Sequence, residues 1–412
     1  AARFAPDAKN FATCSSDKTL VIVDAESGEV SKTIDSFEGS VLGLAWNKDA
    51  TAVVTAAADK TVRVVDVASG QVTFSVKIGN DVMDMQNGCT WVPKTNELVS
   101  VSLRGDLNVI EVGNQTPKLV MRGHAKTVVG LAAVGATVYS ADYSGLLVPW
   151  EMGKGAINKS FTGKGPVAVC AIAANDKVIA TVGQDGKVFV VPTETLKYEK
   201  PLEVKGGALD VAVPSSSTGS AMAVMINESR LVVVGQGNAV LAQKDFERSE
   251  KGSSVAVSAD GSLIAYGMEV SGGSGELRFL QFSGDSLAKT GETIQLPSPP
   301  NRMAITPSAG VVVVGEKSRR VRMYEPMSGK KVDGGGVVHN ARCDAVSISA
   351  DGKYAVTGGL DGSIAVWPIG SDDEPRSMVA AHRGGVTGVS FVDDKTIVSG
   401  GNDSCLRSWT LA

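Results

Sequence analysis

Two stretches near the end of the chain, VTGGLDGSIAVW (Val356–Trp367) and VSGGNDSCLRSW (Val398–Trp409), share one spaced pattern. A Thr or Ser is followed four positions later by an Asp, and six positions after that by a Trp. The pattern returns upstream with Val in place of Trp, in three further copies: Thr13, Asp17, Val23; Thr55, Asp59, Val65; and Thr181, Asp185, Val191. The spacing between neighbouring copies is close to 42 residues.

A period of roughly 40–45 residues with this pattern is typical of the blades of a WD-repeat β-propeller. A His stands before a strand-like run at His124, His339 and His382, where the repeat often has one. Buried polar side chains need partners, so they should occur as sets. We therefore expect one hydrogen-bonded tetrad in each of the last two blades: His339, Thr357, Asp361, Trp367 and His382, Ser399, Asp403, Trp409.

One copy departs from the pattern. Ser144 stands where the Asp is expected, between Ser140 and Trp150, and the nearby Asp142 is out of phase by two positions. We expect Asp142 to contribute far less to stability than Asp361 or Asp403.

The fold predicted from the repeats is all-β, with ten blades. Ten exceeds the four to eight blades with which propellers usually close, so we expect two domains. Residues 1–115 would be the last three blades of a first propeller, and residues 116–412 a complete seven-bladed second propeller. The first four blades of the first ring would then precede Ala1. We expect the strand Lys118–Arg122 to close the second ring by pairing with Leu406–Ala412, so that no sheet edge stays open.

Bulk composition argues against several classes of function. The net charge of −4 gives no clustered basic signature for nucleic acid. No apolar run reaches the roughly 20 residues that span a bilayer. The five cysteines are widely spaced without metal-ligand spacing, which favours free thiols in a reducing compartment.

Several segments resemble the actin-interacting protein 1 family, which has two seven-bladed propellers in one chain. IGNDVMDMQNGCTW (Ile78–Trp91) and ELVSVSLRGDLNVIE (Glu97–Glu111) are similar to its seventh blade. GHAKTVVGLAA with YSADYSG (Tyr139–Gly145) is similar to the opening of its second propeller, and FTGKGPV (Phe161–Val167) also matches in order.

This resemblance implies a non-enzymatic cytoplasmic protein of the actin cytoskeleton that acts with cofilin to promote actin filament disassembly. The partners implied are actin filaments and cofilin, with no cofactor, nucleic acid or membrane. Because much of the family's actin surface lies on the first propeller, we expect this chain alone to be weak in disassembly. Propeller loops usually carry recognition residues, and the candidates on the first three blades are Lys18, Glu38, Lys60 and Arg104.

Other functions remain as alternatives. A generic WD-repeat scaffold for another complex is the main one, and a propeller hydrolase is remote. His382, Ser399 and Asp403 imitate a catalytic triad, but the same spacing recurs in the preceding blade, which favours a structural network. The basic cluster on the hairpin Lys317–Arg322 is more simply a solvated turn than a site for an acidic partner.

Overall fold

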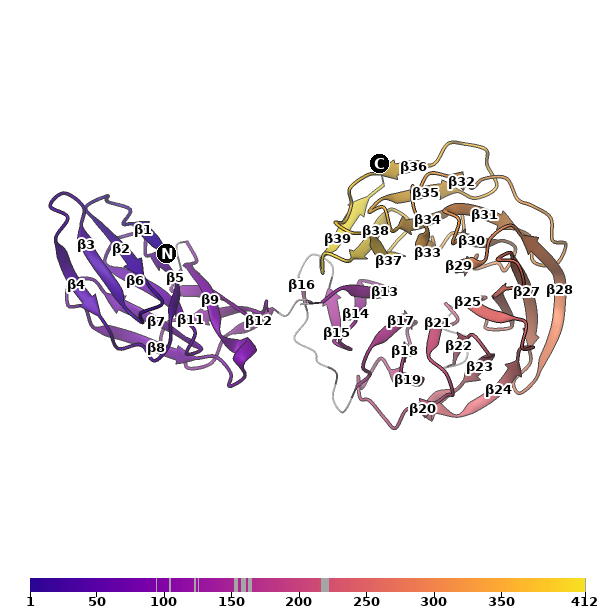
Figure 1. Ribbon diagram of the computed structural model, residues 1–412, viewed down its shortest axis with the longest axis horizontal. Helices are drawn as coiled ribbons and strands as arrows, with labels where there is room; N and C mark the ends of the chain where they lie inside the picture. The colour runs from indigo at the N-terminus through magenta and orange to yellow at the C-terminus, as the bar shows by residue number, and fades with distance from the viewer. Residues whose placement is uncertain are drawn as a thin grey trace. The chain divides into compact units, whose positions relative to one another are not determined.

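The computed structural model describes residues 1–411 except 94, 104, 122–123, 125, 152–154, 157–160, 162–164 and 216–221. These residues form ten small antiparallel sheets, which confirms the all-β fold with ten blades (Figure 1). The chain divides into two compact units, Ala1–Ala125 and Lys126–Ala412.

The first unit contains three four-stranded sheets and one short helix. Its strands are β1 (Ala2–Phe4), β2 (Asn10–Cys14), β3 (Leu20–Asp24), β4 (Val30–Ile34); β5 (Val41–Trp46), β6 (Ala52–Ala57), β7 (Thr61–Asp66), β8 (Val72–Lys77); and β9 (Gln86–Trp91), β10 (Glu97–Ser102), β11 (Leu107–Glu111), β12 (Leu119–Met121). The 3₁₀ helix η1 (Val82–Asp84) precedes β9, and Asp81 caps it.

The second unit contains seven sheets arranged around a common axis, as Figure 1 shows. The first three are β13 (Val128–Val134), β14 (Thr137–Asp142), β15 (Leu147–Glu151), β16 (Gly155–Ala156); β17 (Val169–Ala174), β18 (Val178–Gly183), β19 (Lys187–Pro192), β20 (Leu202–Glu203); and β21 (Ala208–Ala212), β22 (Ala223–Asn227), β23 (Arg230–Val234), β24 (Val240–Asp245). A second 3₁₀ helix, η2 (Gln236–Asn238), joins β23 to β24.

The remaining four sheets complete the ring. They are β25 (Lys251–Val257), β26 (Leu263–Glu269), β27 (Gly275–Phe282), β28 (Leu287–Leu296); β29 (Pro300–Ile305), β30 (Val312–Glu316), β31 (Arg320–Tyr324), β32 (Gly336–Val337); β33 (Cys343–Ile348), β34 (Tyr354–Gly359), β35 (Ile364–Pro368), β36 (Arg376–Met378); and β37 (Val386–Phe391), β38 (Thr396–Gly401), β39 (Leu406–Thr410). The first strand of each sheet is innermost.

The apolar core lies between sheets. Among the described residues it forms nine hydrophobic clusters, and each cluster joins two adjacent sheets of one unit. This follows from the sequence pattern, because the middle strands are near-continuous apolar runs buried on both faces. In β22, for example, all five residues from Ala223 to Asn227 are buried.

The predicted closing strand is wrong. β12 pairs with β11 in the first unit, with Asn108 opposite Val120. Among the described residues, β39 pairs with β38 alone. The physical reason is local: a short loop links β11 to β12, so that pairing costs little closure entropy. Lys118, just before β12, also reaches Glu97 of β10 at 2.6 Å. Arg122 and Ala412 lie outside the described residues.

The ring closes instead by packing its last sheet face to face on its first. Leu131 and Val138 of the first sheet and Val398 of the last form this seam, the smallest of the nine clusters. The Thr387 hydroxyl donates to the carbonyl of Val128 across the seam. The Ser390 hydroxyl accepts the N–H of Ala133 at 3.2 Å.

A glycine makes this close approach possible. A Cβ on Gly388 would lie 2.9 Å from the Leu131 nitrogen and 3.1 Å from the Gly130 Cα, both backbone atoms that cannot move aside cheaply. A register shift between Val386 and Gly388 marks a bulge at the same point of β37. Glycine is therefore required where the last inner strand meets the first.

We predict that Gly388→Ala lowers the free energy of unfolding by about 1–3 kcal/mol, the usual cost of overpacking. Gly310→Ala is the control, since Gly310 is exposed and a Cβ there meets only the Ser308 hydroxyl at 3.4 Å. Urea unfolding followed by tryptophan fluorescence measures both. Equal midpoints for the two variants would show that the seam does not limit stability.

Candidate functional site

The tetrad in the sixth sheet of the ring is a continuous chain of hydrogen bonds. His339 Nε2 lies 2.7 Å from Thr357 Oγ1, and the indole N–H of Trp367 donates to the same oxygen at 2.8 Å. On the other side, His339 Nδ1 lies 2.8 Å from Ser363 Oγ, which donates to Asp361 Oδ1 at 2.6 Å. Since Ser363 gives its proton to the carboxylate, His339 Nδ1 carries a proton and donates to Ser363 Oγ.

The tetrad in the seventh sheet omits the intermediate hydroxyl. His382 Nδ1 contacts Asp403 Oδ1 directly at 2.8 Å, and Nε2 lies 2.8 Å from Ser399 Oγ. The indole of Trp409 donates to that oxygen at 2.8 Å. Arg407 Nη1 donates to Asp403 Oδ2 at 2.8 Å.

These networks tie two loops of each sheet together. The backbone N–H of Asn340 donates to Asp361 Oδ2 at 2.5 Å, and that of Arg383 donates to Asp403 Oδ2 at 3.3 Å. Each Asp therefore holds the loop that enters its sheet against the loop between the second and third strands. Ser399 is fully buried and its oxygen already accepts a Trp N–H, so it has no room to attack a substrate.

The electrostatics fit this structural role. Burial would raise the pKa of Asp403, but hydrogen bonds from His382, Arg407 and the N–H of Arg383 outweigh it, and the pKa lies well below 3.8. The pKa of Asp361 is lowered in the same way, since bonds from Ser363 and Asn340 overcome burial. Burial lowers the pKa of His339, and the charge of Asp361 offsets only part of that effect.

Asp142 is expected to contribute little because it lies two positions out of phase with the repeat, but the structure gives it the contacts of an in-phase Asp. Asp142 is 1% exposed, and its Oδ1 accepts the N–H of Ser144 at 2.9 Å, the Ser144 hydroxyl at 2.5 Å and the N–H of Leu146 at 3.1 Å. Trp150 donates to Ser140 at 2.6 Å, as the repeat requires. Asp142 is the last residue of β14, two positions before the usual place of the Asp, and its carboxylate still binds the turn that follows the strand.

Sequence reasoning missed a further network in the third sheet. Ser100 donates to Gln86 Oε1 at 2.7 Å, and Asn108 Nδ2 lies 3.3 Å from the same atom. All three side chains are buried. Gln86 is the first residue of the inner strand β9, the position that Cys343 holds in β33, and so lies four residues after the place of the repeat's His. The only signal in the sequence was a polar side chain at the start of a predicted inner strand.

The structure gathers the predicted loop residues at one end of the first two sheets. Lys18 and Lys60 occupy the same turn position between second and third strands, with φ of 72° and 71°. The N–H of Glu38 donates to Asp59 Oδ2 at 3.2 Å, next to Lys60. Lys60 Nζ donates to the carbonyl of Asn80 at 2.7 Å, whereas Lys18 and Glu38 are exposed. Arg104 lies outside the described residues.

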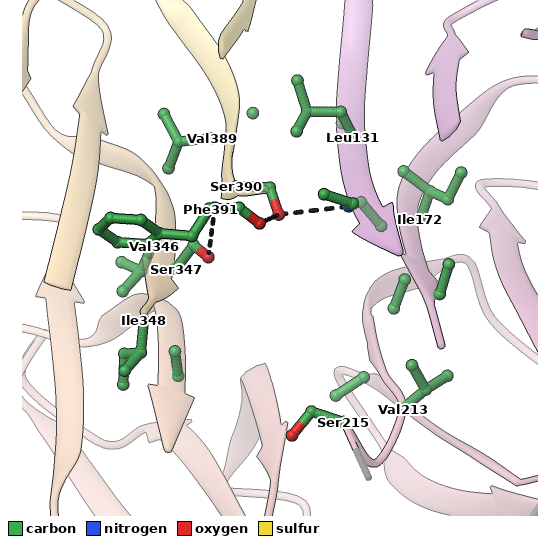
Figure 2. Close-up of a pocket in the computed structure, with 18 of the residues that line it drawn as sticks. Leu131, Ile172, Val213, Ser215, Val346, Ser347, Ile348, Val389, Ser390 and Phe391 are labelled. Atoms are coloured by element: carbon green, nitrogen blue, oxygen red, sulfur yellow. Dashed lines mark hydrogen bonds between the residues drawn. The ribbon is translucent and has the colours of Figure 1, made fainter. Parts of the chain in front are cut away.

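A cavity of about 890 Å³ runs along the axis of the seven-sheet ring, between the inner strands. Figure 2 shows apolar side chains such as Leu131, Ile172 and Val346 facing it. Ser347 and Ser390 also line it, but each hydroxyl accepts a backbone N–H. The Asp210 carboxyl is held by two backbone N–H groups, of Val211 and Val255, and burial raises its pKa. The described lining also includes the charged residues Asp176, Arg302, Asp344 and Asp393.

Other sites are lacking within the described part of the chain. It contains no group of three or more His, Cys, Asp or Glu side chains placed to hold a metal ion. It also has no helix with the length and hydropathy of a membrane span. The five cysteines are free thiols, and burial raises the pKa of Cys343 to about 12.

We predict that Asp361→Ala, Asp403→Ala and Asp142→Ala each lower the free energy of unfolding by about 1–3 kcal/mol, because each leaves buried donors unpaired. Asp372→Ala is the matched control, since Asp372 is exposed in a loop of the sixth sheet. Chemical denaturation of the four variants decides the matter. If the variants of Asp361, Asp403 and Asp142 had the same denaturation midpoint as the control, a structural role for these carboxylates would be contradicted.

We predict that stability falls in two steps as the medium is acidified. The pKa of His339 is lower in the folded protein than in the unfolded chain, so protons bind the unfolded chain first as the pH falls. The free energy of unfolding therefore begins to decrease below about pH 6.5, the ordinary pKa of histidine. Asp361 and Asp403 also have lower pKa values in the folded protein, so the free energy of unfolding decreases a second time below about pH 3.9, the ordinary pKa of aspartate. Thermal unfolding against pH measures both. His339→Gln, which keeps a hydrogen-bonding amide but cannot titrate, should flatten the first step; an unchanged slope would assign that step to other groups.

The family model described as WD domain, G-beta repeat matches residues 28–66, 337–368 and 374–410. WD repeat-containing protein 1 of Gallus gallus is 26% identical over 423 residues, covering 100% of this chain and 67% of that protein. The 66 kDa stress protein of Physarum polycephalum is 28% identical over 419 residues, with 99% and 67% covered.

Actin-interacting protein 1 of Drosophila melanogaster is 27% identical over 426 residues, covering 99% of this chain and 66% of that protein. Actin-interacting protein 1 of Caenorhabditis elegans and actin-interacting protein 1-2 of Arabidopsis thaliana align with equal coverage of this chain. The chain is thus a WD-repeat protein with ten blade-like sheets among its described residues, and along its full length it is similar to proteins named actin-interacting protein 1 and WD repeat-containing protein 1.

Proposed function

We propose that this protein is a non-enzymatic, actin-binding protein that acts with cofilin to promote the disassembly of actin filaments. The observation that carries the proposal is the alignment of 99% of the chain with proteins named actin-interacting protein 1. Its partners would be actin filaments and cofilin, and its place the actin cytoskeleton of the cytoplasm.

The geometry of the described residues supports binding rather than catalysis. The histidines of the last two sheets are engaged in buried networks, and neither is among the described residues that line the axial cavity. What the fold presents to a partner is a set of short loops held on rigid sheets. Propeller function is usually carried by such loops.

Within this proposal, Lys18, Glu38 and Lys60 are the candidate contacts. They lie at one end of the first two sheets, linked through Asp59 and through the Ser40 hydroxyl, which donates to the Ser16 carbonyl at 3.2 Å. Both lysines hold the left-handed backbone conformation, which fixes the direction in which each side chain leaves its turn.

We predict that the protein cosediments with actin filaments better in the presence of cofilin than in its absence. Lys18→Glu with Lys60→Glu should weaken the cofilin-dependent binding on the order of tenfold, since two contact charges reverse. The matched control is Lys9→Glu with Lys48→Glu, because those exposed lysines lie in the turns at the opposite end of the same two sheets.

The outcomes separate the proposal from its alternative. Equal losses in both double variants would remove these lysines as contacts while leaving the actin function intact. Absence of any cofilin-dependent cosedimentation or filament shortening would contradict the actin function and favour a scaffold in another complex.

A further inference from the structure

One loop surface of the seven-sheet ring has a charge opposite to that of the whole chain. Its exposed basic residues come from the fifth, sixth and seventh sheets, the orange to yellow part of Figure 1, and are Lys317, Arg319, Arg320, Arg342 and Arg383. The chain as a whole carries a net charge of −4. This basic loop surface therefore differs in sign from the rest of the molecule.

The acidic residues of the same loops do not cancel these charges at the surface. The side chain of Glu316 is 0% exposed and is paired with Arg322. Asp361 and Asp403 are 14% and 12% exposed and serve the two tetrads. Asp344 is 14% exposed and accepts from Asn301 and Arg342. Lys317 is an exception, because its Nζ pairs at 2.7 Å with Glu269 of the fourth sheet, whose side chain is 38% exposed. The carboxylates of the loops in the fifth to seventh sheets lie inward, and the guanidinium groups of Arg319, Arg320 and Arg383 lie outward.

The loops form one continuous surface. The N–H of Leu360 donates to the Arg342 carbonyl at 3.0 Å, so the loop entering the sixth sheet touches the loop inside it. Gly385, two residues after Arg383, packs on Leu360. On the other side, Gly315 packs against Cys343, which brings the Lys317–Arg320 turn beside Arg342.

The composition of this surface suits carboxylates. Four of its five basic residues are arginines, whose planar fork matches a carboxylate with two parallel hydrogen bonds. Arg319 holds φ of 71°, the same turn position as Lys18 and Lys60. The ring has Gly186 and Gly362 at this place in other sheets, and glycine adopts that conformation without steric cost.

We propose that the basic loop surface of the fifth to seventh sheets docks an acidic polypeptide segment of a partner protein. Recognition consists of arginine–carboxylate pairs on a backbone that the two tetrads hold in place. The surface belongs wholly to the second unit, so this docking is independent of the proposed loop contacts at Lys18 and Lys60 and of cofilin.

The test is fluorescence anisotropy of the whole chain with a labelled peptide of alternating glutamate and serine at low ionic strength. We expect binding that weakens with added salt and is lost when glutamine replaces glutamate. Arg319→Glu with Arg383→Glu should weaken it about tenfold or more. The control, Lys330→Glu with Lys331→Glu, changes exposed charges at the other end of β31 and should leave affinity within about twofold.

Each other result overturns the proposal. These results are no binding of the acidic peptide, equal binding of the glutamine peptide, or equal loss in both double variants. Single-stranded DNA that competes at lower concentration and fails with the arginine variant would assign the surface to nucleic acid instead. Arg319→Gln with Arg383→Gln, compared by circular dichroism and thermal unfolding, keeps the test decisive if the charge reversal impairs folding.

Discussion

Each small sheet of this protein has two apolar faces and can bury them only against its neighbours. The nine clusters of the described core all lie between sheets, and none lies within a single one. A four-stranded sheet is too narrow to fold back on itself, so the sheets must stack, and the twist of each sheet turns the stack around an axis. Ring geometry is thus a consequence of burial, and the loops at the rim follow from it.

The polar networks solve a second problem, which is how to keep exposed loops in one conformation. A carboxylate such as Asp361 or Asp403 reaches two loops at once, and an imidazole links it to a buried hydroxyl and indole. Loops that would otherwise fluctuate are fixed to the interior of the sheet. A surface composed of such loops can bind a partner with little ordering cost, because its backbone is already arranged.

Much of this was predictable from the spacing of residues. Thr357, Asp361 and Trp367 reveal their relation through sequence separation alone, because the strands and turns between them have nearly fixed lengths. Asp142 escaped because a side chain can reach a turn from a neighbouring position, which spacing does not record. Gln86 escaped because it stands inside the inner strand, four residues after the place of the repeat's His, where the pattern expects no polar side chain. The partner of β12 escaped because strand pairing depends on loop entropy and competing edges, which a repeat pattern does not contain.

The seam at Leu131, Val138 and Val398 has a consequence for the order in which the ring comes apart. Among the described residues this joint has the smallest cluster of fully buried apolar side chains, and hydrogen bonds from Thr387 and to Ser390 supplement it. We therefore expect local opening of the second unit to begin where the first and last sheets meet and to spread sheet by sheet, as in a linear repeat array. The sheets farthest from the seam would then keep their hydrogen bonds longest.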